Sequence, residues 1–141
     1  MVLLEGIYDN NNGTFTAYFS YINTTLEALT APIGDGPSGR NFFSPGAAGR
    51  GQPTRFLPGE HRGEYRLDFD GAPLEWVIQV VGFEEIRIAF SSSSKKLPVV
   101  TPIVDCINES ESGGFSSVWG YDNPNEFEIS IPVGSLNAFT P

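Results

Sequence analysis

The sequence has little of the chemistry that enzymes use, because its 141 residues include one cysteine and one histidine, Cys106 and His61. One cysteine cannot form a disulfide within the chain, so Cys106 is a free thiol or a link between chains. Metal sites and catalytic triads need several converging side chains, and we interpret His61 as an exposed turn residue. No glycine-rich phosphate loop, paired-carboxylate motif or nucleophile elbow is present. We therefore expect no enzymatic activity, no metal and no cofactor.

Basic residues and long apolar runs are also scarce. The chain has eight Lys and Arg residues and seventeen Asp and Glu residues, and the resulting net charge of −9 repels nucleic-acid phosphates and anionic lipids. No window approaches the length of a membrane span, and the start MVLLEGIYDNNN lacks the basic and apolar regions of a signal peptide. These absences exclude nucleic acids and membranes from the expected partners. For a secreted protein, they predict the mature part or an excerpt of a longer chain.

Helical periodicity is absent as well, whereas strand and turn signals are frequent. Residues 14–23, TFTAYFSYIN, alternate, which predicts a half-buried strand with Phe15, Ala17, Phe19 and Tyr21 on its buried face. Sixteen glycines and eleven prolines bound short apolar stretches and leave little room for helices. Further strands are expected at 26–31, 54–57, 63–69, 74–81 and 84–90. This pattern predicts an all-β fold, and within it an antiparallel β-sandwich rather than a parallel α/β sheet.

The chain repeats part of itself at an offset of 100 residues. The same residue types recur at this offset for Ile7, Gly13, Phe15, Tyr21, Asn23, Pro32 and Gly34. Beyond Gly34 the first copy carries four extra residues, so that Asn41, Phe43 and Pro45 meet Asn137, Phe139 and Pro141 at an offset of 96. Surface loops commonly vary in length in this way. The offset predicts one complete repeat followed by the first part of a second.

The repeat divides the chain into three expected parts. Residues 1–90 are expected to form a complete sandwich. Residues 91–103, SSSSKKLPVVTPI, have the serine, lysine and proline content of an extended linker. Residues 104–141 begin the second copy and lack the strands that follow the FFSPG loop of the first.

Several stretches of both copies share the pattern of a known kind of repeat. They are FSYIN, APIG, NFFSPGAAGRGQPTRFLPG and YRLDFDGAPLEWVI in the first copy, and WGYDNPNEFEISIPVGSLNAFTP in the second. These stretches resemble the tandem immunoglobulin-like β-sandwich repeats of secreted bacterial surface proteins. The resemblance covers most of residues 4–90 and all of 104–141, and residues 50–59 are its most specific part. It implies an immunoglobulin-like module outside the cell that acts as a spacer or in assembly, with no catalytic activity.

The incomplete second copy is expected to leave apolar side chains without a cover. They are Phe115, Trp119, Tyr121, Phe127, Ile129 and Ile131. Burying such side chains is worth about 1.5–3 kcal/mol each, so their shelter amounts to on the order of 10 kcal/mol. We expect these residues to join copies of the chain head to tail by strand addition, giving an extracellular or cell-surface filament. The alternative is an adhesin or carbohydrate-binding module from a longer tandem array, in which later residues complete the second copy and glycans are the partners.

Two patterns could indicate calcium. DNNNG at 9–13 looks like the start of an EF-hand loop, but its glycine falls one position early and the bidentate glutamate is missing. Asp68 and Asp70 share one face of a predicted strand and could form half a site. We interpret all of these residues as turn formers and as a solvated strand face.

Aromatic residues and sequons could indicate carbohydrate. Flat rings stack on sugars, and the available rings are Trp76, Trp119, Tyr18 and Tyr121. We interpret both tryptophans as core residues, because each occupies an apolar or inward register. Three Asn-x-Ser/Thr sequons mark possible glycosylation at Asn12, Asn23 and Asn108, with Asn23 as the first choice.

Overall fold

The computed structural model describes residues 1–131, 133, 137 and 138 as strands, turns and irregular segments. Two compact units are formed, one by Met1–Leu97 with Ile131–Pro141, the other by Pro98–Ser130. Neighbouring strands of every sheet are antiparallel, so the expected all-β class is confirmed. In the part of the chain that the structure describes, no helix has the length and hydropathy needed to cross a membrane.

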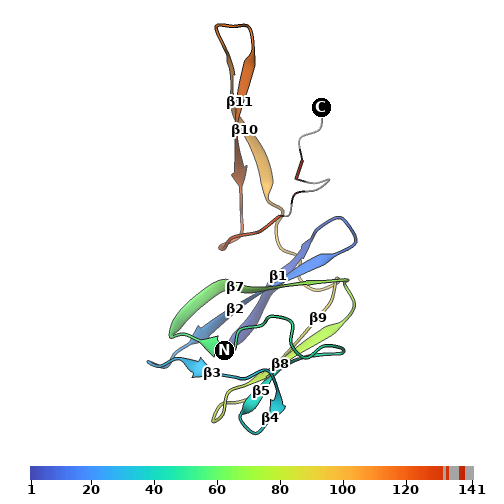
Figure 1. Cartoon of the computed structure of the whole chain (residues 1–141), viewed down its shortest axis with the longest axis vertical. Coiled ribbons are helices and arrows are strands. Elements are labelled where there is room, and N and C mark those ends of the chain that lie inside the picture. Colours follow the sequence, from blue (N-terminus) through green and yellow to red (C-terminus); the bar gives the residue numbers. More distant parts are fainter. Residues whose placement is uncertain (132, 134–136, 139–141) are drawn as a thin grey trace. The chain divides into compact units, whose positions relative to one another are not determined.

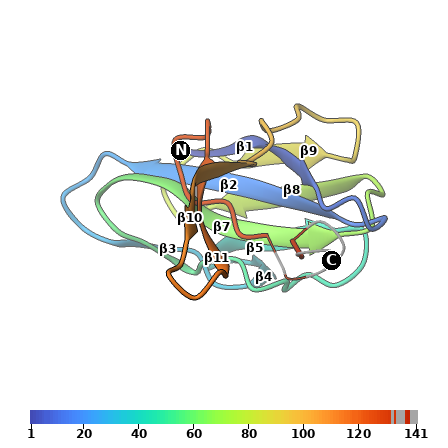
Figure 2. The same ribbon diagram turned by 90° about the horizontal axis from the view of Figure 1, so that it is seen from above.

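The first unit contains two larger sheets and one short strand pair (Figures 1 and 2). One larger sheet has the order β1-β2-β7, and the other has the order β4-β5-β8-β9. The strand bounds are β1 Val2–Asp9, β2 Phe15–Asn23, β3 Leu29–Thr30, β4 Gly34–Gly36, β5 Gly39–Ser44, β6 Arg55–Phe56, β7 Gly59–Phe69, β8 Leu74–Gln79 and β9 Ile86–Phe90. The short pair is β3 with β6.

The two larger sheets share one apolar core, built mainly from aromatic rings. Phe19 of β2 is 1% exposed, and its ring centroid lies 5.1 Å from that of Trp76 on β8 and 5.3 Å from that of Phe90 on β9. Tyr65 of β7 stacks on Phe19 within the same sheet, with centroids 5.7 Å apart. Aromatic pairs of this kind contribute about 0.5–1.5 kcal/mol beyond their burial. The predicted core position of Trp76 is confirmed.

Strand β2 is buried on both faces, whereas its alternation predicts one solvent-exposed face. Thr16, Tyr18 and Ser20 point away from the aromatic core, yet each is at most 4% exposed. The reason is the central position of β2 between β1 and β7. Thr16 donates a hydrogen bond to the Asp68 carboxylate of β7 at 2.7 Å, and Ser20 donates to the Glu5 carboxylate of β1 at 2.5 Å. Polar side chains of the neighbouring strands thus cover the outer face of β2.

One buried polar residue ties the β5 side of the core together. Asn41 is fully buried, and its Nδ2 donates to the carbonyl oxygens of Ala31 at 2.9 Å and of Pro53 at 2.8 Å. Its Oδ1 accepts a hydrogen bond from the indole Nε1 of Trp76 at 2.9 Å. Because a buried polar group without partners is costly, these three bonds hold β5, β8 and two loops in one arrangement.

Part of the predicted linker packs against the first unit. The Ile7 N–H donates to the Lys95 carbonyl at 2.8 Å, and the Leu97 N–H donates to the Ile7 carbonyl at 2.9 Å. Gly6 makes room for this segment, since a Cβ there would lie 2.9 Å from both the Leu97 side chain and the Lys95 carbonyl. The observed unit boundary follows Leu97, and β10 already begins at Thr101. The stretch 91–103 therefore differs from a single extended linker.

Burial of Tyr65 predicts a loss of stability in alkali. Its hydroxyl donates to the Arg50 carbonyl at 2.8 Å, and burial raises its pKa well above the usual value. An unfolded tyrosine loses its proton near pH 10, whereas folded Tyr65 keeps it. Its contribution is therefore complete below about pH 10 and is lost as the pH rises from there through the folded pKa.

The measurement is urea unfolding at pH 8 and at pH 11. The free energy of unfolding of the native chain is expected to fall more steeply between these two values than that of Tyr65→Phe. Burial also raises the pKa of Tyr21. The free energy of unfolding of Tyr65→Phe should therefore still fall with rising pH, but by less than that of the native chain. Equal losses in the two proteins would contradict the prediction.

Candidate functional site

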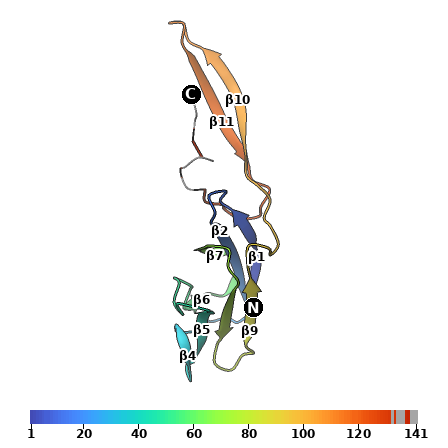
Figure 3. The same cartoon turned by 90° about the vertical axis from the view of Figure 1, so that its right-hand side faces the viewer.

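The second unit contains a two-stranded hairpin (Figure 3), and several of its apolar side chains are exposed. Its strands are β10, Thr101–Glu109, and β11, Phe115–Asp122. Phe115 and Tyr121 are each 74% exposed, and Trp119 is 47% exposed. Trp119 Nε1 donates to the Ser117 hydroxyl, which shares its face of β11, at 2.8 Å. Large apolar groups gathered on one strand face are typical of a contact surface.

The hairpin reproduces the pairing of β1 with β2 at an offset of 100. The register from Val2↔Tyr21 to Asp9↔Phe15 recurs from Pro102↔Tyr121 to Glu109↔Phe115. Both hairpins carry a bulge at the same place, between Leu4 and Gly6 in the first and between Val104 and Cys106 in the second. A bulge fixes register, because one residue of slip would move every side chain to the other face. The equivalent side chains therefore project on equivalent faces.

The two hairpins differ in how far their equivalent side chains are buried. Phe19 and Tyr21 of β2 are 1% and 5% exposed, whereas their counterparts Trp119 and Tyr121 are exposed to solvent, so the interpretation of Trp119 as a core residue is wrong for this chain. In the first unit β7 pairs with β2, and β8 and β9 supply rings that pack on Phe19. Among the described residues, β11 has β10 as its only strand neighbour.

An asparagine at the end of each hairpin, Asn23 in the first and Asn123 in the second, makes the same local hydrogen bonds. Asn23 Nδ2 donates to the carbonyl four residues later at 2.8 Å, and its Oδ1 accepts from the N–H two residues later at 3.0 Å. Asn123 makes the equivalent bonds at 2.9 and 3.1 Å. Asn23 also donates to the Phe56 carbonyl of β6 at 3.0 Å. The shared bonds are local in sequence, and the additional one comes from a later strand.

Asn41 and Asn137 form a second pair of equivalent asparagines, which share one local hydrogen bond. Asn137 Nδ2 donates to the Ile131 carbonyl at 3.1 Å, as Asn41 does to the Ala31 carbonyl at 2.9 Å. Asn41 has two more partners, Pro53 and Trp76, both from residues that follow its loop. The hairpin, Asn123 and Asn137 thus repeat local interactions that their counterparts make in the first unit.

The structure brings together three of the six predicted assembly residues. Phe115, Trp119 and Tyr121 alternate along β11 on one face. Phe127, Ile129 and Ile131 follow in a partly buried segment that forms no strand. Sequence reasoning missed further exposed apolar residues of the hairpin, which are Ile103, Val104, Ile107 and Val118. Applying the offset of 100 to the apolar residues of β1 and β2 would have identified them.

The three sequons occupy different environments. Asn12 and Asn108 lie exposed at the two hairpins. Asn23 is 4% exposed, and both of its Nδ2 hydrogen bonds lead to backbone carbonyls. A glycan on that nitrogen would displace these bonds, so Asn23 is unsuited to modification in the folded protein, contrary to its expected first rank.

The other residues that the sequence offered as candidates for catalysis or metal binding have structural roles or lie apart from one another. His61 lies in β7 rather than in a turn, and its ring stacks on Tyr21 with centroids 4.5 Å apart. The Asp68 carboxylate accepts from Thr16, and the Asp70 carboxylate accepts from the Ala72 N–H at 2.9 Å. Cys106 is exposed on β10. Within the described residues, no three His, Cys, Asp or Glu side chains gather as metal ligands would.

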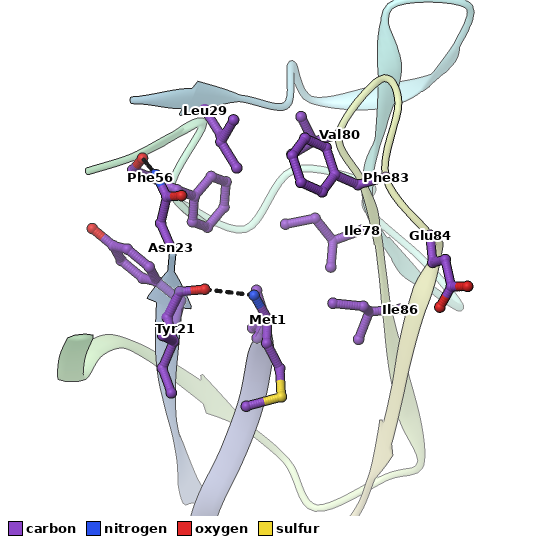
Figure 4. A pocket seen from close by; sticks show the side chains of 12 residues that line it. Met1, Tyr21, Asn23, Leu29, Phe56, Ile78, Val80, Phe83, Glu84 and Ile86 are labelled. Atoms are coloured by element: carbon purple, nitrogen blue, oxygen red, sulfur yellow. Dashed lines mark hydrogen bonds between the residues drawn. The ribbon is translucent and has the colours of Figure 1, made fainter. Parts of the chain in front are cut away.

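An apolar groove of about 410 Å³ opens at one end of the first unit's core (Figure 4). Ile78 and Ile86 line one side of it, and Met1 and Tyr21 line the other. The ammonium group of Met1 donates to a backbone carbonyl of β2 at 2.6 Å. Glu84 is the one carboxylate among the lining residues. The groove can shelter apolar groups but lacks the paired groups that acid and base chemistry requires.

Comparison with protein-family models, with curated proteins and with solved structures finds no match.

Proposed function

We propose that the protein is an extracellular structural protein, the subunit of a surface filament, and that residues 104–141 join subunits by β-strand addition. The observation that carries the proposal is the contrast between two hairpins of equal register. In the first, later strands bury the aromatic face; in the second, the same face lies open.

The proposal interprets the first unit as an immunoglobulin-like antiparallel β-sandwich and residues 104–141 as the opening part of a second copy. Support comes from the shared register, the shared bulge and the hydrogen bonds common to Asn23 and Asn123. The two larger sheets of the first unit, packed through one aromatic core, fit this architecture. The resemblance to repeats of secreted bacterial surface proteins supports a location outside the cell.

Energetics favours covering the hairpin. Transferring Phe115, Trp119 and Tyr121 out of water would yield about 1.5–3 kcal/mol each. An edge strand with unpaired backbone groups is also a template for another strand. A contact between two different surfaces of the same molecule repeats without closing, unless rotation forms a ring. Copies of the chain joined in this way therefore form a fibre.

Electron microscopy of the full chain tests the proposal, with light scattering as the measure of mass. Fibres are expected from the native chain and from Leu26→Asp, a matched control because Leu26 is 98% exposed in the first unit. Trp119→Asp should lower the fibre mass at least tenfold, because it places a charge on the face to be buried. A monodisperse native monomer would refute the filament.

A carbohydrate-binding module is the second candidate, favoured by the exposure of Trp119 and Tyr121 on one strand face. Such rings can stack on sugars. A glycan array on the full chain separates the two functions. Binding that is lost in Trp119→Ala while assembly persists would support the module.

A further inference from the structure

We propose that β11 of one chain joins the free edge of β1 in a second copy of the chain, antiparallel to it, so that the rings of Trp119 and Tyr121 cover the apolar groove at that end of the first unit. This inference rests on the proposed function, because it takes the hairpin as the surface that joins chains. It adds the partner strand, the register and the groove that receives the rings.

The equivalence of the two hairpins indicates which strand can receive β11. The pairs β1–β2 and β10–β11 have the same register and the same bulge. Two equivalent hairpins laid side by side in the same orientation form one sheet of order β10-β11-β1-β2, with antiparallel neighbours and equivalent faces on the same side. Trp119 and Tyr121 then lie on the face that carries Phe19 and Tyr21. Strand β7 does not allow this arrangement, because it runs in the direction of β1 but offers the opposite edge of the sheet.

Strand β1 has free backbone groups near its start. The Ile22 N–H donates to the Met1 carbonyl at 2.7 Å, and the Met1 nitrogen donates to the Ile22 carbonyl at 2.6 Å. Because successive residues of a strand direct these groups to opposite edges, those of Val2 and Leu4 point away from β2. Among the described residues, the segment 95–97 is the one that pairs with this edge, farther along β1. The edge is therefore open from Val2 to Leu4.

The apolar groove lies beside this open edge (Figure 4). Strands β1 and β9 are outer strands of the two larger sheets, and Val2 and Ile86 of these strands line the groove together with Ile78. Met1 and Phe83, which also line it, are 68% and 48% exposed. Both sheets thus leave apolar side chains uncovered at this end. Because β1 directs Val2 into the core, a strand added to its edge projects its own core-facing side chains over the same opening.

The open length of β1 sets the register. The backbone groups of Trp119 and Tyr121 point away from β10, as those of their counterparts in β2 point away from β1. With Tyr121 opposite Val2 and Trp119 opposite Leu4, both residues can exchange backbone hydrogen bonds with β1. A shift of two residues in one direction would set Trp119 against the segment 95–97, and a shift in the other would leave only one ring beside the open edge.

Charge complementarity also favours this edge. Residues 101–122 contain no lysine or arginine and four carboxylates, which are those of Asp105, Glu109, Glu111 and Asp122. The only two lysines of the chain, Lys95 and Lys96, are exposed in the segment that borders the open edge. In the expected register β11 continues past Leu4 toward this segment, so the acidic hairpin approaches both lysines.

The contact joins two different surfaces, and each chain has one of each. It therefore repeats from copy to copy while the first unit of every chain stays intact, as a fibre requires. Because the segment 95–97 takes the edge of β1 beyond Leu4, the paired region is short. The contact thus depends on the rings in the groove as well as on strand pairing, and the two can be tested separately.

Disulfide cross-linking between full chains tests the strand and the register. All variants carry Cys106→Ser, which removes the native thiol. In the expected register Leu3 and Gly120 form a pair without hydrogen bonds, in which Cα atoms lie about 4.5 Å apart and a disulfide can form. Leu3→Cys and Gly120→Cys chains are mixed and oxidised, so that a bond between the two sites joins two chains. Mass spectrometry measures the product.

Val118→Cys in place of Gly120→Cys is the matched control, because position 118 lies on the same face of β11 and two residues away. We expect about fivefold less product from the control pair, since diagonal neighbours lie about 7–8 Å apart. A larger yield with Val118→Cys than with Gly120→Cys would overturn the register. Trace yields from both pairs would overturn β1 as the partner.

Phe83→Asp tests the groove. Association of the full chain, followed by the shift of Trp119 emission to shorter wavelength as the chain concentration rises, should weaken about tenfold, because the new charge lies where the rings are to be buried. Val81→Asp is the matched control, since Val81 belongs to the same turn, is 63% exposed and does not line the groove. Equal affinities of the two variants would overturn the groove as the site of the rings.

Micrographs report separately on the filament. Cross-links between the Leu3→Cys and Gly120→Cys chains without fibres would refute the proposed function alone. Fibres that form without this cross-link would refute the present inference alone.

Discussion

Asn41→Ala is expected to lower the free energy of unfolding of the first unit by about 3–5 kcal/mol. The substitution leaves three groups without their partner: the buried Trp76 indole N–H and Ala31 carbonyl, and the partly buried Pro53 carbonyl. An orphaned buried group costs about 1–3 kcal/mol, and relaxation makes three such costs less than additive. Small domains have about 5–15 kcal/mol in total, so the variant should approach the limit of stable folding.

Urea unfolding followed by Trp76 fluorescence measures this loss. Asn137→Ala is the matched control, because Asn137 is exposed and makes the equivalent single bond to Ile131. We expect the control to change the free energy of unfolding by less than about 0.5 kcal/mol. Asn41→Asp keeps the acceptor for Trp76 but sets a carboxylate oxygen against two carbonyl oxygens in a fully buried site, so its loss at pH 7 should be at least as large as that of Asn41→Ala. A loss below about 1 kcal/mol for Asn41→Ala would contradict the assigned network.

The role of Asn41 illustrates what the sequence could not provide. Its side-chain partners lie 10, 12 and 35 residues away, and no local pattern links an asparagine to such positions. Trp76 was predictable as a core residue, because it stands in an apolar run bounded by turns. That its indole N–H requires an acceptor is general chemistry, but which residue supplies it depends on how β5 and β8 pair.

Strand prediction located β2, β3 and β6 to β9 with somewhat different bounds, and it missed β1, β4, β5 and β10; residues 42–44 of the expected FFSPG loop belong to β5. The alternation from Phe15 to Tyr21 identified β2 almost to the residue. Strand β1 was missed, because its bulge between Leu4 and Gly6 breaks the alternation. Its counterpart β10 was missed for the same reason, and its first residues were included in the predicted linker. A bulged strand still pairs with its neighbour, but its apolar and polar residues no longer alternate regularly in the sequence.

The candidate surface was predictable in part. An offset found in the letters alone singled out Phe115, Trp119 and Tyr121, which the structure exposes together on β11. Position 106 shows the limit of the comparison. Its counterpart Gly6 is required by the close approach of Lys95 and Leu97, whereas Cys106 is exposed. Such a requirement depends on a distant segment, which only the folded chain reveals.

Phe19→Ala is expected to lower the free energy of unfolding by about 3–5 kcal/mol, the usual cost of removing a buried aromatic ring. Phe19 is 1% exposed, and its ring contacts those of Tyr65, Trp76 and Phe90 at 5.1–5.7 Å between centroids. No nearby side chain can fill the resulting cavity without leaving its own contacts. Urea unfolding again provides the measurement, and a loss below about 1.5 kcal/mol would show that the core is loosely packed.

Trp119→Ala is the matched control, because Trp119 occupies the position equivalent to Phe19. It tests whether two positions that match in sequence also contribute equally to stability. In the single chain it should change the free energy of unfolding by less than about 0.5 kcal/mol, because nearly half of the Trp119 surface is already in water. In assembled material the cost should move toward that of Phe19→Ala, since burial rather than residue type sets the magnitude. Fibres whose stability is insensitive to Trp119→Ala would mean that subunits meet elsewhere. The same substitution at two equivalent positions thus measures what a covering strand contributes.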